Sequence, residues 1–158
     1  AAWQVRGSNN GRSIVRLYLD NCCFNRPFDD QSQTRIRLEA EAKLCIQQHV
    51  RNGALELAWS YVLDYENEAN PLQERRTTIA DWKPLSCVDL AENEAILARA
   101  RALAGLGLRP KDALHVACAV EGSCTHFVTT DDQILKRAAA LREIAIVDPT
   151  TLVREANL

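Results

Sequence analysis

The chain has 158 residues, of which 47% are hydrophobic and 25% charged, a composition typical of one folded globular domain and not of a disordered chain. Its 19 Lys and Arg residues nearly balance 21 Asp and Glu residues, so the overall charge does not indicate a nucleic-acid binder, although it does not exclude a local basic patch. No apolar run approaches the ~20 residues that span a membrane and no secretion leader is evident, so we expect a cytoplasmic protein without a membrane partner.

Short apolar runs alternate with longer helical stretches along the chain. Strands are predicted at residues 14–19, 55–59, 85–88, 126–129 and 144–147. Helices are predicted at 31–52, 60–70, 72–82, 91–106, 111–121 and 130–140, with a short tail helix after the last strand. This alternation is typical of an α/β domain with a central parallel sheet of about five strands and helices on both faces.

Two helices carry more specific signals. In the first, Ile36, Ala40, Leu44 and the Cys45/Ile46 pair lie near helical spacing, and Asn52-Gly53 is expected to end the helix. At the start of the 130–140 helix, Thr130 with Gln133 three residues later fits a capping box.

Residues 1–13 are expected to form a tail or an added segment, and residues 14–158 a single domain. The six cysteines form no C-x-x-C pair and mostly sit in apolar contexts. We therefore expect reduced, buried thiols and no disulfide framework.

Acidic residues follow the predicted strands at the edge where open α/β sheets bind their ligands. Asp20 ends the first strand, Asp131 follows the strand at 126–129, and Asp112 opens a nearly apolar helix. Glu66 lies in the helix after the second strand, and its neighbours Asp64 and Glu68 are each about 200° away around a helix, so only one of the three is expected to face the site.

Converging carboxylates repel one another unless a cation neutralises them or their pKa values rise. An oxygen-only ligand set suits Mg²⁺ or Mn²⁺, and such ions support in-line phosphoryl displacement by water. Aspartates are also ordinary turn and cap residues, so structural capping is the alternative interpretation of Asp20 and Asp131.

Four segments of the sequence resemble the PIN-domain family. They read Y-L-D-N at 18–21, S-Y-V-L-D-Y-E at 60–66, K-D-A-L-H-V-A at 111–117 and F-V-T-T-D at 127–131, and the likeness extends from about residue 14 to residue 147. The resemblance implies a PIN-like three-layer α/β/α fold and a Mg²⁺- or Mn²⁺-dependent ribonuclease. It also implies an RNA substrate and, as in the many family members that are toxins of the VapC type, an antitoxin protein partner and a homodimer.

The resemblance also assigns roles to single residues. Asp20, Glu66, Asp112 and Asp131 match the family's catalytic, metal-binding acids, and Thr129 or Thr130 would support them by hydrogen bonding. The hydroxyl residue that commonly follows the first aspartate is absent here, and Asn21 would replace its hydrogen bond.

Three other features invite two interpretations each. His115 shares a helix face with Asp112 and would contact phosphate or bound water, or else form a buried hydrogen bond, which we favour. Arg26, in a polar insert at 25–31 that suits a substrate or partner loop, is either an RNA phosphate contact or a surface arginine. Trp59 and Trp82 would stack a base or, as we favour, pack in the core.

The sequence therefore predicts an endoribonuclease whose four acids hold a metal-activated water. Two alternatives remain: a non-catalytic PIN-like module that binds RNA or protein, and a phosphoryl-accepting signalling domain. The latter class places paired acids after its first strand, whereas Asp20 has no acidic neighbour.

Overall fold

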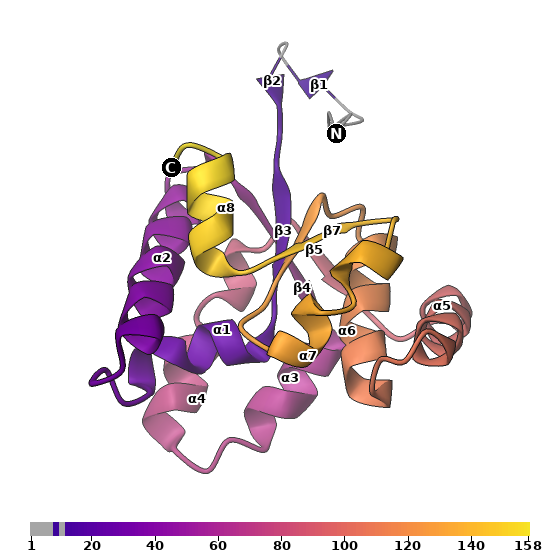
Figure 1. Cartoon of the computed structure of the whole chain (residues 1–158), viewed down its shortest axis with the longest axis horizontal. Helices are drawn as coiled ribbons and strands as arrows, with labels where there is room; N and C mark the ends of the chain where they lie inside the picture. The colour runs from indigo at the N-terminus through magenta and orange to yellow at the C-terminus, as the bar shows by residue number, and fades with distance from the viewer. Residues whose placement is uncertain (1–7, 10–11) are drawn as a thin grey trace.

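The computed structural model describes residues 8–9 and 12–158. A five-stranded sheet in the order β5-β4-β3-β6-β7 forms its centre, and every neighbouring pair is parallel (Figure 1). The strands are β3 (Arg16–Leu19), β4 (Glu56–Ser60), β5 (Val88–Leu90), β6 (His126–Val128) and β7 (Ala145–Val147). The predicted parallel sheet of about five strands is confirmed.

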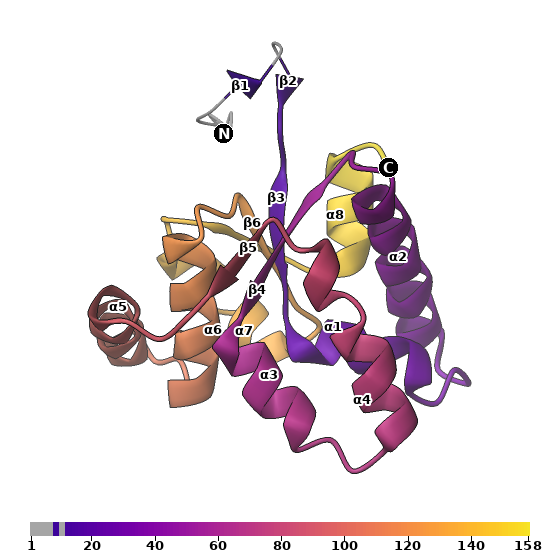
Figure 2. The ribbon, with the colours of Figure 1, turned by 180° about the vertical axis from the view of Figure 1, so that it is seen from behind.

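Helices cover both faces of this sheet. They are α1 (Asn21–Asn25), α2 (Thr34–Arg51), α3 (Tyr61–Glu68), α4 (Gln73–Ala80), α5 (Glu94–Gly105), α6 (Pro110–Glu121), α7 (Asp132–Leu135) and α8 (Pro149–Glu155). Both ribbon views place α2 and α8 on one side of the strands and α5 and α6 on the other (Figures 1 and 2). This arrangement is the predicted three-layer α/β/α fold, and no helix of the described ranges is long and apolar enough to cross a membrane.

The predicted tail is only partly described. Two short strands, β1 (Ser8–Asn9) and β2 (Arg12–Ser13), pair antiparallel with each other and lie outside the central sheet. Residues 1–7 and 10–11 of that tail lie outside the described residues.

The core lies around the central strands. Leu17, Tyr18 and Leu19 of β3 have no exposed surface, and the Tyr18 ring stacks on Phe127 of β6 with centroids 5.5 Å apart. Strands in the middle of a parallel sheet are buried on both faces, and β3 and β6 are accordingly apolar after their first residues. All six cysteines are free. Cys23, Cys118 and Cys124 are buried as predicted, whereas Cys22 and Cys45 are half-buried and Cys87 is exposed, contrary to the prediction.

Two element predictions were wrong at their ends. The predicted helix at 130–140 is instead α7 followed by a 3-10 turn at Ala138–Ala140, and its N-cap is Asp131, whose side chain accepts the Gln133 N–H. Thr130 forms no capping box because it is buried, with its N–H directed at the Cys22 Sγ atom. The strand predicted at 85–88 begins only at Val88, as β5. A 3-10 turn at Lys83–Leu85, with Pro84 in its first positions, precedes it and delays strand pairing.

The apolar positions that predicted helix α2 do not all lie on its buried face. Leu44 is exposed, whereas Glu39 and Lys43 are buried. Glu39 is neutralised by ion pairs with Arg26 and Arg35, and the Lys43 ammonium lies 5.6 Å from the centroid of a core aromatic ring. Such pairing across elements overrides helical hydrophobic periodicity.

Candidate functional site

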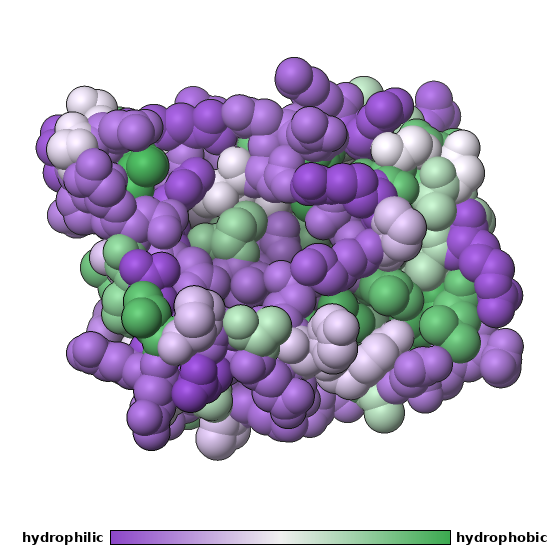
Figure 3. Space-filling model, turned by 90° about the horizontal axis from the view of Figure 1, so that it is seen from below, coloured by the Kyte–Doolittle hydropathy of each residue, from purple (hydrophilic) through white to green (hydrophobic). Residues whose placement is uncertain are grey.

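Four acidic side chains from four separate elements line one cleft at the carboxyl end of β3. Asp20 directly follows β3, Glu66 lies on α3, Asp112 lies in the first turn of α6, and Asp131 caps α7. The molecule seen from this end is mostly hydrophilic across its middle (Figure 3). The strand-end rule thus located the cleft from sequence.

Asp20 is the most buried of the four and is held by three donors. Its Oδ1 accepts the Asn21 N–H at 2.8 Å, and its Oδ2 accepts the Thr129 hydroxyl at 2.8 Å and the Cys22 thiol at 3.4 Å. Burial raises the pKa of Asp20 although these hydrogen bonds and the nearby His115 oppose that shift. A charged Asp20 therefore benefits from any cation placed beside it.

Glu66 is tied to a buried chain of hydrogen bonds. The His115 Nε2 atom bonds Glu66 Oε1, and His115 Nδ1 lies 2.6 Å from the Tyr18 hydroxyl, which lies 2.6 Å from Ser60 Oγ. In the form with a neutral His115, Ser60 donates to Tyr18, Tyr18 donates to Nδ1, and Nε2–H donates to the carboxylate. The network therefore orients His115 and Glu66.

The ionised form of the Glu66 carboxyl is also favoured. Burial alone would raise its pKa, but the hydrogen bond from His115, the nearby Lys111 ammonium and the Asn21 amide bring the pKa of Glu66 below its ordinary value. The Asn21 Nδ2 atom donates to Glu66 Oε2 at 3.0 Å, and Lys111 Nζ lies 4.0 Å from the same oxygen. Glu66 is therefore held ionised in the cleft.

Asp112 and Asp131 form a second pair, bridged by an arginine. The Arg109 guanidinium donates through Nε to Asp112 Oδ2 at 2.7 Å and through Nη2 to Asp131 Oδ2 at 2.5 Å. Thr129 connects this pair to the first, since its hydroxyl donates to Asp20 and accepts the Asp131 N–H at 3.1 Å. The two halves of the site thus share one buried threonine.

The structure separates the neighbouring acids on α3. Asp64 accepts the Trp59 indole N–H at 2.9 Å and an ion pair from Lys83 at 2.8 Å, while Glu68 is exposed. Only Glu66 of these three lines the cleft.

Other predicted contacts lie elsewhere. Arg26 is bound to Asp29 and to the buried Glu39, so its guanidinium serves the packing of the 25–31 segment on α2 and does not line the cleft. Trp59 and Trp82 are buried in the core, as favoured.

Sequence reasoning missed three residues of the cleft. Arg109 and Lys111 flank Pro110 at the start of α6, and Tyr65 is 70% exposed at the rim beside Glu66. Arg109 carried a usable signal, because a residue preceding a helix-starting proline lies beside the first-turn acid.

The donor set of the cleft suits a hard divalent cation. All four acids offer oxygen, and the buried Asn21 Oδ1 has no hydrogen-bond partner within the described structure. The acids nevertheless stand as two pairs, and no group of three or more Asp, Glu, His or Cys side chains in residues 8–9 and 12–158 is arranged to hold a metal ion. Arg109 already supplies a positive charge to both Asp112 and Asp131.

Comparisons with known proteins agree with this geometry. The chain matches the family model described as the PIN domain over residues 17–141. It is similar to a chain in the crystal structure of VapBC2 from Rickettsia felis bound to a DNA fragment from their promoter, with a TM-score of 0.51, 12% identity, and coverage of 84% of this chain and 97% of that chain. That likeness shows a shared fold, and no curated protein sequence matches the chain. Because the family model spans most of its length, the chain belongs to the PIN domain family.

Proposed function

We propose that the chain is a Mg²⁺- or Mn²⁺-dependent endoribonuclease that hydrolyses RNA phosphodiester bonds in this cleft. The observation that carries the proposal is the convergence of Asp20, Glu66, Asp112 and Asp131 from four elements of a PIN-family chain on one edge of the sheet. PIN domains are generally nucleases, and four carboxylates exceed what capping alone requires. A divalent cation, when bound, supplies activation of water and neutralisation of phosphoryl charge.

The side chains of the cleft divide the remaining work. Asp20 and Glu66 would hold the cation on one side, with their orientations fixed by Thr129 and His115, and Asp112 with Asp131 would hold it on the other. Fixed ligand orientation of this kind raises metal affinity, because little reorganisation is needed on binding. The exposed Tyr65 ring at the rim offers a surface on which an RNA base stacks.

The test is cleavage of a mixed structured RNA by the purified protein with Mn²⁺, with Mg²⁺ and with chelator. We expect metal-dependent cleavage that Asp112→Asn and Glu66→Gln abolish. Asp64→Asn is the matched control, since Asp64 lies two residues from Glu66 but outside the cleft. Folded protein that binds RNA without cleaving it under any metal would favour the non-catalytic module instead.

We further propose that the chain acts as the toxin of a toxin–antitoxin pair, with an antitoxin protein as its partner. The support is its PIN fold and its likeness to a chain of the VapBC2 complex. Induced expression in bacteria should then arrest growth, and the Asp112→Asn variant should not. Growth arrest by both proteins alike would contradict a toxin that acts through this cleft. Homodimer formation stays a prediction, which light scattering of the purified protein checks.

A further inference from the structure

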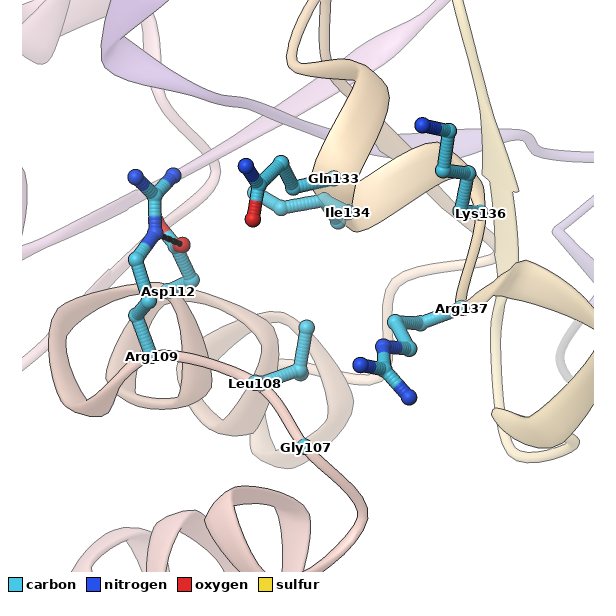
Figure 4. Close-up of a pocket in the computed structure, with 8 residues that line it drawn as sticks. All are labelled: Gly107, Leu108, Arg109, Asp112, Gln133, Ile134, Lys136 and Arg137. Carbon is cyan, nitrogen blue, oxygen red and sulfur yellow. Dashed lines mark hydrogen bonds and ion pairs between the residues drawn. The ribbon is translucent and has the colours of Figure 1, made fainter.

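A second pocket lies beside the carboxylate cleft, between the start of α6 and the segment that contains α7. It shares Arg109 and Asp112 with the cleft, and Gln133, Lys136 and Arg137 complete its polar lining. Figure 4 shows Arg109 and Arg137 on opposite sides of the pocket. The pocket therefore carries three cationic side chains beside Asp112, and Arg109 connects it to Asp131.

Two of these cations have no partner of opposite charge at ion-pair distance within the described ranges. Lys136 and Arg137 are both exposed and form no salt bridge there. The acid nearest to Lys136 in sequence, Asp132, is already bound by both terminal nitrogens of Arg35, at 2.9 and 2.8 Å. Their charge is thus available to an anionic ligand.

The Arg137 guanidinium lies close to the backbone opposite it. Gly107 has φ +100°, and a Cβ atom added there would lie 2.8 Å from Arg137 Cζ. The positive φ of Gly107 favours glycine, and the absence of a Cβ atom leaves room for the guanidinium beside this backbone. A planar guanidinium at this place offers several N–H donors to a phosphate.

We propose that this pocket binds a backbone phosphate of the RNA strand next to the one at the carboxylates. This inference rests on the proposed ribonuclease function and extends it by naming a substrate subsite. A single strand carries one negative charge at every nucleotide, so a strand that enters the cleft brings a neighbouring phosphate to Arg109, Lys136 and Arg137. Because the contact is made to backbone, it strengthens binding without selecting a base sequence.

The experiment measures binding of a single-stranded RNA hexamer by fluorescence anisotropy at several salt concentrations. All proteins carry Glu66→Gln, which prevents cleavage and lies outside the pocket. The test variant adds Lys136→Gln and Arg137→Gln. The matched control adds Arg154→Gln, an exposed arginine in the last turn of α8, whose C-terminal end lies far from the carboxyl end of β3 (Figure 1).

We expect the test variant to bind the hexamer about 10-fold more weakly, and the salt dependence of its binding constant to fall by about 0.7 per lost contact. The control should match the parent. Equal binding by test variant and control overturns the subsite, even if the chain with Glu66 intact cleaves RNA. If that chain neither cleaves nor binds RNA, the proposed function fails as well.

Two further arms identify the ligand. Inorganic phosphate, added as a competitor, should not weaken hexamer binding by the parent to the level of the test variant. If it does, the pocket binds a free anion and not a strand. If the substitutions leave the hexamer unaffected but weaken binding of an acidic peptide, the pocket is a protein-docking site and the inference is wrong.

Discussion

Removing the Tyr18 hydroxyl tests whether the buried hydrogen-bond chain behind Glu66 acts as one unit. That hydroxyl lies 2.6 Å from both Ser60 Oγ and His115 Nδ1, and all three residues are fully buried. Tyr18→Phe leaves the Ser60 hydroxyl without an acceptor and His115 Nδ1 without a donor. Each orphaned buried group costs about 1–3 kcal/mol, so the free energy of unfolding should fall by about 2–6 kcal/mol.

Ser60→Ala should lower the free energy of unfolding by less than Tyr18→Phe does. It removes one end of the hydrogen-bond chain and the N-cap hydroxyl that accepts the Leu63 N–H at 3.4 Å. A lost cap of this kind costs about 1 kcal/mol. In the double variant no Ser60 hydroxyl remains to be orphaned. Its loss of stability should therefore be smaller than the sum of the single losses by about 1–3 kcal/mol.

The assay is urea unfolding of the four proteins with their denaturant slopes compared. Tyr61→Phe is the matched control, because the Tyr61 hydroxyl is buried without a partner in the described structure and its removal should cost nothing. Additive losses for Tyr18 and Ser60, or a Tyr61→Phe loss as large as that of Tyr18→Phe, would refute the network. In the proposed ribonuclease, Tyr18→Phe should also lower cleavage by about 10- to 100-fold, because it frees the side chain that orients Glu66.

Four further variants probe charge and backbone. Burial lowers the pKa of Lys43 from 10.5 to about 8, so the unfolded chain binds more protons between these values, and stability should rise there by up to about 3 kcal/mol. Lys43→Met should abolish that rise in urea unfolding followed against pH; an unchanged rise would assign it to other groups. Arg109→Gln should lower the dissociation constant for Mn²⁺ in calorimetry, because it removes the charge bridging two cleft acids; unaltered affinity would show that the bridge does not compete with metal. Gly107→Ala should cost about 1–2 kcal/mol at φ +100°, whereas Gly105→Ala, with open space around it, should not destabilise the protein.

The sequence predicted the architecture and the location of the acids because both depend on local pattern. Asp20 and Asp131 follow short apolar runs, and a parallel sheet brings the ends of such runs to one edge. Asp112 follows Pro110, which starts helices. These signals require no knowledge of which elements touch.

The missed features depend on contacts between distant segments. Helix α1 has only five residues and no helical periodicity, and burial of Cys23 and Phe24 stabilises it. Glu39 and Lys43 are buried on α2 because Arg26, from outside that helix, pairs with Glu39 and the Phe24 ring packs near the Lys43 ammonium. Deciding between Thr130 and Asp131 as the cap of α7 required knowing that Thr130 is buried against Cys22.

The pairing of the acids changes one argument that the sequence suggested. Four converging carboxylates would destabilise a fold without metal if they repelled one another freely. Here Arg109 bridges Asp112 and Asp131, while His115 and Lys111 stand beside Glu66, so the protein's own donors offset much of that repulsion. Retention of the acids is therefore compatible with a stable metal-free fold, and it does not by itself exclude a non-catalytic module. A cation held by Asp112 or Asp131 would compete with Arg109 for their negative charge, and cleavage, not folding, is the property that separates the two functions.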